Sequence, residues 1–97
     1  MSSSQTLVKR EDADIIVRML YYCSEPRIES QIKSYAEIDS VQFDKFSNHC
    51  IRKGLLRKFI SRDRTDEGEI YYVVTDVGRR TLVTAQEIME ALGLNPP

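Results

Sequence analysis

Several residue types are scarce in this chain, and each shortage excludes a class of protein. The 97 residues include four glycines, three prolines and no tryptophan. This is too little glycine and proline for a linker or a low-complexity chain, and no internal repeat is present. The glycines are single and scattered, which excludes a glycine-rich phosphate loop. The composition predicts one ordered domain with one modest core.

Metal ligands and nucleophiles are equally few. The one histidine, His49, precedes Cys50, and the other cysteine is Cys23, so no paired spacing of metal ligands exists. Because neighbouring residues on a helix point in different directions, His49 and Cys50 do not form a catalytic pair. We therefore predict that the protein is not an enzyme, that it has no catalytic residue, and that it binds no metal and no cofactor.

The chain also lacks a long apolar run. The longest one, residues 70–74, is far too short to cross a bilayer, and the polar N-terminus has no apolar core of a signal peptide. We expect a cytoplasmic protein without a membrane partner, in which both cysteines stay reduced and buried. If the source is a hyperthermophile, an intracellular disulfide and a redox-responsive protein are the alternative.

Charge is balanced overall but unevenly placed. The net charge is −1 and the pI is near 5.8. Seven of the fourteen basic residues lie between residues 45 and 64, where Asp63 is the single acid, and acids predominate from residue 65 onward. This asymmetry argues against indiscriminate coating of nucleic acid and favours one local basic surface.

The first half of the chain carries the pattern of two helices. Apolar residues recur on one helical face from Glu11 to Cys23, and residues 24–26 end that helix. Ile28 is expected to add a short edge strand. A second, shorter helix is expected from Glu29 to about Ala36.

A third helix, from Asp39 to Lys53, has the clearest signals. Asp39 and Gln42 have the spacing of a capping box, and Gly54 is the expected left-handed residue after the helix end. The apolar stripe between them consists of Phe43, Phe46, Cys50 and Ile51.

A hairpin and a last helix complete the chain. Strands are expected at residues 55–62 and 70–75, joined by a turn at 66–69. Thr75 can cap a helix from Asp76 to about Leu92. Coiled-coil spacings of 4, 3, 4 and 3 join Gly78, Leu82, Ala85, Met89 and Leu92 over barely two heptads. We predict a dimer interface at Ala85, Ile88, Met89 and Leu92.

This order of elements predicts an α+β, mostly α, winged helix-turn-helix fold with three helices, a β-hairpin wing and a C-terminal helix. The expected parts are a flexible N-terminal arm (1–10), the winged helix-turn-helix domain (11–75), a C-terminal dimerisation helix (76–94) and a tail (95–97). In such a fold the second helix of the motif lies in the major groove of DNA. The third helix of this chain is then the candidate DNA reader.

The side chains suited to DNA lie on the outer face of that helix and on the wing. Gln42 suits a bidentate contact with adenine, Lys45 suits guanine or phosphate, and Ser40 suits a phosphate beside free backbone amides. Asp44 would repel phosphate and must point aside. The predicted helix residues are Ser40, Val41, Gln42, Lys45, Asn48, His49 and Arg52. The predicted wing residues are Arg57, Lys58, Arg62 and Arg64, which are weaker candidates because the wing tip is acidic.

Two motifs carry a resemblance to a known family. Residues 51–56 (IRKGLL) are similar to its L-x-x-K-G-L-I, and residues 72–79 (YVVTDVGR) are similar to its Y-x-L-T-x-x-G-R. On these motifs residues 32–92 resemble the small archaeal winged-helix proteins regarded as transcriptional regulators, some of which are chromatin-associated dimers. The resemblance implies that Tyr72, Val74 and Leu82 are core residues, that the third helix binds DNA and that the last helix pairs with a second copy.

Two departures favour a regulator with a specific site over an abundant chromatin coat. The chain is slightly acidic where basic members of that family are positive, and its last helix is shorter than a long antiparallel coiled coil. We therefore expect a dimeric, nucleoid-associated transcriptional regulator whose partners are double-stranded DNA and a second copy of itself. The alternative is a winged helix that binds proteins in a transcription complex or another complex, which the acidic wing tip favours.

Overall fold

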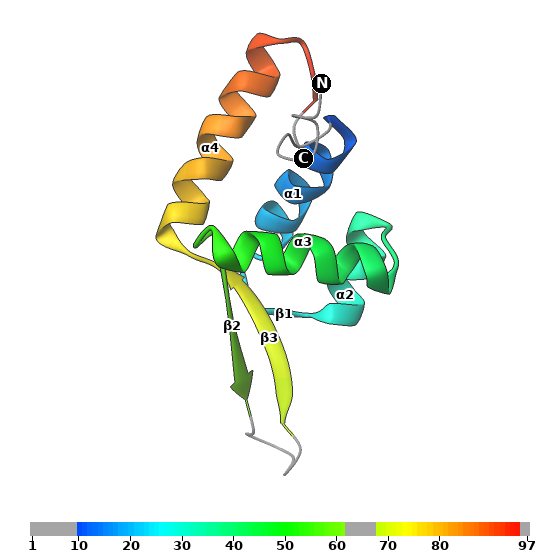
Figure 1. The fold of residues 1–97 in the computed structure, drawn as a ribbon. Helices are drawn as coiled ribbons and strands as arrows, with labels where there is room; N and C mark the ends of the chain where they lie inside the picture. The colour runs from blue at the N-terminus through cyan, green and yellow to red at the C-terminus, as the bar shows by residue number, and fades with distance from the viewer. Residues whose placement is uncertain (1–9, 62–67, 96–97) are drawn as a thin grey trace, which may run out of the picture.

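The computed structural model describes residues 10–61 and 68–95, and these residues adopt the expected winged helix-turn-helix fold (Figure 1). Each predicted helix and strand is confirmed to within one residue of its expected bounds. The elements of the described residues are α1 Arg10–Tyr22, β1 Arg27–Ile28, α2 Glu29–Ala36, α3 Ser40–Arg52, β2 Leu56–Ser61, β3 Glu69–Val74 and α4 Asp76–Ala91.

The sheet is antiparallel, with strand order β1-β3-β2. Leu56 pairs with Val74, and the register continues outward to Ile60 opposite Ile70. Because side chains alternate along a strand, Leu56, Val74 and Tyr72 share one face, which packs on the helices. The distal half of the hairpin extends beyond the helical body as the wing (Figure 1).

One core lies between the sheet and the first three helices. Phe43 meets Tyr72 edge-on, with 5.2 Å between ring centroids, and this contact joins α3 to β3. The resemblance-based expectation for Tyr72, Val74 and Leu82 holds, since the first two are buried and the third packs against the core. The buried members are Met19, Leu20, Cys23, Ile32, Ala36, Ile38, Phe43, Phe46, Cys50, Leu56, Tyr72 and Val74.

Two glycines fix the path of the chain between these elements. Gly54 has a φ of 74°, the left-handed conformation expected after the end of α3, and it turns the chain into β2. Gly78, near the start of α4, lies against Leu55, just before β2, and against the end of β3: a Cβ there would overlap the carbonyl oxygen of Leu55 and lie 2.6 Å from Val74 Cγ2. Only glycine permits this approach.

The start of α4 is fixed by Thr75. Its Oγ1 accepts a hydrogen bond from the Gly78 N–H at 2.9 Å and donates one to the Gly54 carbonyl oxygen at 2.6 Å. The predicted helix cap is therefore present, and it also ties α4 to the turn after α3. From this junction α4 and the hairpin run in opposite directions (Figure 1).

Candidate nucleic-acid interface

The helix α3 buries one face and leaves the other open. Ser47 is buried although the sequence did not indicate it, and its hydroxyl donates to the Asp44 carbonyl oxygen at 3.5 Å. The other buried side chains of α3 are Phe43, Phe46 and Cys50. On the opposite face a helical spacing of three to four places a line of exposed side chains, hereafter the outer line of α3: Val41, Lys45, Asn48 and Arg52.

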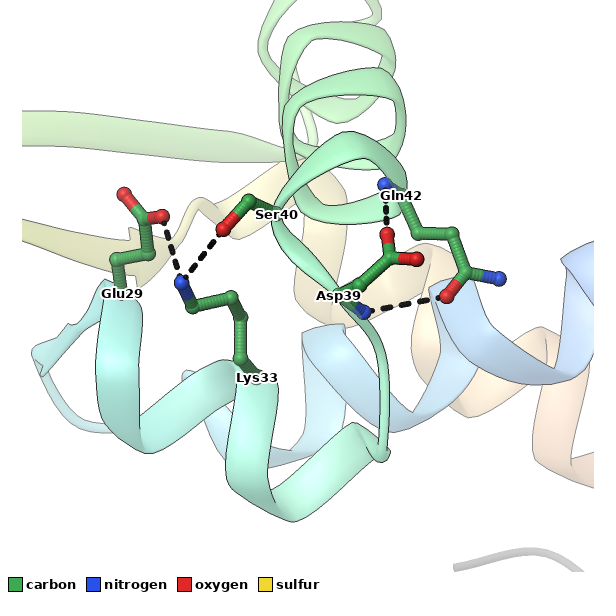
Figure 2. A network of polar contacts seen from close by, with 5 residues as sticks. All are labelled: Glu29, Lys33, Asp39, Ser40 and Gln42. Atoms are coloured by element: carbon green, nitrogen blue, oxygen red, sulfur yellow. Dashed lines mark hydrogen bonds and ion pairs between the residues drawn. The ribbon is translucent and has the colours of Figure 1, made fainter.

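The first turn of α3 carries the expected capping box, which engages the side-chain oxygen of Gln42 (Figure 2). The Asp39 carboxylate accepts a hydrogen bond from the Gln42 backbone N–H at 2.8 Å, and Gln42 Oε1 accepts one from the Asp39 backbone N–H at 3.2 Å. The carbonyl oxygen of the Gln42 side chain thus faces its own backbone. A bidentate contact with adenine needs both ends of this amide, so it would compete with the cap.

Lys33 of α2 contacts the N-terminal end of α3, although the sequence did not indicate this contact. Its Nζ donates to Ser40 Oγ at 2.9 Å and lies 3.1 Å from the Glu29 carboxylate (Figure 2). It places an ammonium group beside the first turn of α3. The bend between α2 and α3 creates this contact, so no periodic signal in the sequence could have indicated it.

Lys45 leans toward the start of α1. Its Nζ lies 3.8 Å from the Asp12 carboxylate and 5.1 Å from the Phe46 ring centroid. The Lys45 side chain is still 66% exposed, and an ion pair this exposed contributes less than about 1 kcal/mol. Asp12 therefore orients Lys45 without holding it firmly.

The remaining predicted residues of α3 differ in their exposure. Asn48 and Arg52 are exposed, whereas His49 is half-buried on the flank of the outer line. Asp44 is exposed three residues after Val41 and four before Asn48, so it lies beside the outer line. A phosphate in contact with α3 has to avoid that side.

On the wing, Arg57 and Lys58 point to opposite faces. Lys58 pairs with Tyr72 in the sheet register and so shares the face that α3 covers nearer the body. Arg57 lies on the other face, where its guanidinium is 5.4 Å from the Phe59 ring centroid. Two of the predicted wing residues, Arg62 and Arg64, lie outside the described residues.

The four residues predicted at a dimer interface fall into two pairs. Ala85 and Met89 are half-buried and, together with Ile88 and with Val17 of α1, line a groove of about 560 Å³ between α1 and α4. Ile88 is 54% exposed and Leu92 is 70% exposed. The described residues thus leave apolar surface uncovered at the far end of α4.

The two cysteines are buried free thiols, as expected for a reduced protein. Burial raises the pKa of Cys23 and of Cys50 to about 12, and repulsion from Cys50 adds to the increase at Cys23. Because the thiolate is the reactive form, neither side chain is prepared for disulfide exchange.

The described part of the chain contains no cluster of three or more histidine, cysteine, aspartate or glutamate side chains placed to hold a metal ion. Across residues 10–61 and 68–95, every helix is too short or too polar to span a bilayer.

Solved structures with a similar fold come from several bacteria. A PadR family transcriptional regulator from Eggerthella lenta has 21% identity and a TM-score of 0.72, over 92% of this chain and 83% of that one. A PadR-like transcription factor from Bacteroides fragilis has 18% identity and a TM-score of 0.69, over 94% of this chain and 90% of that one. The smu.1704 protein of Streptococcus mutans has 16% identity and a TM-score of 0.74, over 89% of this chain and 83% of that one.

In sequence, the chain matches a family profile but no individual protein with a curated description. No protein with a curated description matches the chain in sequence. The sequence profile of the family described as winged helix-turn-helix, however, matches residues 9–92, which is most of the chain. The chain belongs to the winged helix-turn-helix family.

Proposed function

We propose that this protein is a DNA-binding transcriptional regulator that acts as a homodimer, with α3 in the major groove and the wing beside the phosphate backbone. The observation that carries the proposal is the open outer line of α3, whose opposite face is fully covered by the chain's own core. An exposed polar helix face of this kind fits the width of the major groove. Membership of the winged helix-turn-helix family agrees with the absence of enzymatic activity.

The charges of the described residues support the same placement. Residues 40–61 contain five basic side chains against one acid, Asp44. Two basic side chains, Lys45 and Arg52, stand on the outer line, and Lys58 stands on the wing face that continues from it. Lys33, which also pairs with Glu29, places its ammonium group at the first turn of α3, where free backbone N–H groups favour a phosphate.

The similar structures support the regulatory role by analogy. Two of them are described as a PadR family transcriptional regulator and a PadR-like transcription factor. Their identities to this chain are 21% and 18%, so the argument for this protein depends on its own α3 and wing. Binding to the chromosome would place the protein in the cytoplasm at the nucleoid.

The test is the affinity for a labelled random duplex and for the DNA upstream of the protein's own gene, at several salt concentrations. We expect tighter binding to the upstream DNA. In a plot of the logarithm of the binding constant against the logarithm of the salt concentration, the magnitude of the slope should fall by about one for each phosphate contact removed. Lys45→Ala and Arg52→Ala should weaken binding. Arg80→Ala, an equal loss of charge on the exposed face of α4, is the matched control and should have little effect. If neither duplex binds at low salt, DNA binding is excluded.

The dimer is supported by the far end of α4. Ile88 and Leu92 are four residues apart, hence on one side of the helix, and both are exposed. A second copy that packed there would cover this apolar side and extend the groove beside Met89. Dimers of this fold class place two reading helices about 34 Å apart on a palindromic site.

The dimer proposal is tested by the mass in solution. Leu92→Glu places a charge in the proposed interface and should convert the dimer to a monomer. Val83→Glu places the same charge on an exposed valine on another side of α4 and should leave the mass unchanged. A monomeric mass for the unaltered protein at high micromolar concentration, or a dimeric mass for Leu92→Glu, argues against this interface.

A protein-binding winged helix is the second candidate, and one observation favours it. Ile60 and Ile70 face each other across the hairpin, and their exposed fractions are 55% and 47%. An apolar pair on an exposed hairpin is suited to a protein contact. A variant with Ile60→Ser and Ile70→Ser that kept full DNA affinity would show that this pair is free for such a partner.

A further inference from the structure

The groove between α1 and α4 has the size and the lining of a small-molecule site. Its volume is about 560 Å³, and ligand sites in proteins commonly measure about 300 to 1,000 Å³. We propose that this groove binds a small organic cation with an apolar body. The inference does not depend on DNA binding, because α1 and α4 lie on the side of the helical body opposite to the wing (Figure 1).

Most of the groove is apolar. Six of the nine described residues that line it have apolar side chains. Val17 is buried, Ala85 and Met89 are half-buried, and Ile88 is exposed, so the apolar surface continues from the interior to the outside. The thioether of a methionine also makes favourable contacts with aromatic rings. This lining suits a ligand whose body is apolar and carries rings.

The charged residues among those nine are both acids. Glu11 and Asp14 are three residues apart and therefore lie on the same side of α1. Asp14 pairs with Arg18 at 3.2 Å, but the two side chains are 42% and 41% exposed, so this pair contributes less than about 1 kcal/mol. Glu11 forms no ion pair with any residue that the structure describes. Two carboxylates are thus available to a cation in the groove.

The C-terminal end of α4 adds to the negative potential. A helix C-terminus carries about half a negative charge, which basic residues in the last turn commonly offset. The last turn of α4 contains no basic residue, and Leu94 and Asn95, which follow the helix, also line the groove. The N-terminus of α1 contributes about half a charge of the opposite sign, which Glu11 and Asp14 outweigh. The charges around the groove therefore favour a cation.

A second copy of the chain fits the groove less well than such a ligand. The proposed dimer contact is at Ile88 and Leu92, of which only Ile88 lines the groove, so a second copy can pack beside the groove without filling it. The far end of a second α4 also carries Glu87 and Glu90, which Glu11 and Asp14 would repel.

The experiment titrates the full-length protein with tetraphenylphosphonium and with tetraphenylborate, an anion of nearly the same shape, and measures the heat of binding. We expect a dissociation constant below about 0.1 mM for the phosphonium. The borate should bind at least about tenfold more weakly, because it meets two carboxylates in place of two favourable charges. Equal affinities for the two ions, or no binding of the phosphonium, would overturn the inference.

Variants then assign the binding to the groove. Glu11→Gln and Asp14→Asn should each weaken phosphonium binding by about twofold to fivefold, while Glu90→Gln, an equal loss of charge outside the groove, should not. Ala13→Lys adds a positive charge at an exposed position of the lining and should abolish binding. Val83→Lys, with the same charge on another side of α4, should retain it.

Two results would place the phosphonium elsewhere or assign the groove to another occupant. Unchanged affinity in Ala13→Lys, with the fold confirmed by circular dichroism, would show that the ion binds outside the groove. Binding to the Leu92→Glu variant but not to the unaltered protein would show that a second copy fills the groove. Either result overturns the inference, and neither bears on DNA binding by α3.

Discussion

The helices α3 and α4 have similar sequence patterns but different surroundings. Four side chains of α3 are buried in the chain's own core, whereas only Gly78 is buried in α4, although α4 is the longer helix at 16 residues against 13. Near its start α4 is held by Thr75, Gly78 and Leu82, but further along, Ile88 and Leu92 remain exposed.

This difference separates two uses of an amphipathic helix. Because the apolar face of α3 is satisfied within the chain, its polar face is free to contact DNA. The described residues leave the apolar side chains at the far end of α4 exposed, and this is the surface on which we propose that a second copy packs. One helix therefore carries the proposed recognition and the other the proposed assembly.

The largest effect on stability is expected when one apolar side chain is truncated on each of the two helices. Phe43→Ala should lower the free energy of unfolding by about 3–5 kcal/mol, because it removes a fully buried ring. That loss should not depend on protein concentration. Ile88→Ala should have little effect on the monomer but should destabilise the protein in a concentration-dependent way, because the proposed contact is with a second copy. Urea unfolding at two protein concentrations measures both, and an equal, concentration-independent loss would remove the distinction.

The anchored start of α4 is tested by Gly78→Ala. The added Cβ would overlap the Leu55 carbonyl oxygen, so α4 or the backbone at Leu55 has to shift, at a cost of about 1–3 kcal/mol. Thr84→Ala, an exposed change on the same helix, should leave the midpoint of thermal unfolding nearly unchanged. A Gly78→Ala protein as stable as the unaltered one would mean that α4 is not held closely against Leu55 and Val74.

Two thiols buried in the core, Cys50 of α3 and Cys23 after α1, predict a loss of stability at alkaline pH. Folding raises the pKa of Cys23 and Cys50 from 9.0 to about 12, so above pH 9 the unfolded chain releases protons that the folded chain retains. The stabilisation is complete below pH 9 and falls as pH rises toward 12, by roughly 1.4 kcal/mol per pH unit for each thiol. Urea unfolding between pH 8 and pH 11 should detect this slope, and the double variant Cys23→Ala, Cys50→Ala should flatten it. An equal slope in both proteins would assign the loss to other groups.

The smallest expected effect concerns the exposed side of α3. Asp12→Asn removes the carboxylate that orients Lys45 and should raise the affinity for DNA by about twofold to fivefold. Asp14→Asn removes the same charge from α1, where Asp14 instead pairs with Arg18 at 3.2 Å. Affinity measured at low salt should rise more for Asp12→Asn, and equal increases would indicate a general charge effect.

Much of the fold could be predicted because its determinants are local. Asp39 and Gln42 mark the start of α3, Gly54 marks its end, and Thr75 caps α4, and each of these signals depends on residues within a few positions. The apolar stripe of α3 likewise follows from helical periodicity alone. Local hydrogen bonding and side-chain periodicity are properties of short segments, so they can be recognised in the sequence.

The site was less predictable, because it depends on segments that meet in space. The sequence named Gln42 and Lys45, but only the fold shows that Gln42 is engaged by its own cap and that Lys45 lies near Asp12 of α1. It also did not indicate Lys33, which reaches Ser40 across the bend between α2 and α3.

The same division applies to the whole molecule. The sequence by itself determined the order, the bounds and the buried faces of the elements, since propensity, capping and periodicity act over a few residues. Only the tertiary structure decided which polar groups remain available on α3 and which apolar groups remain uncovered on α4. Those outcomes depend on how helices and strands pack against one another, and packing is set by distances that no short segment contains.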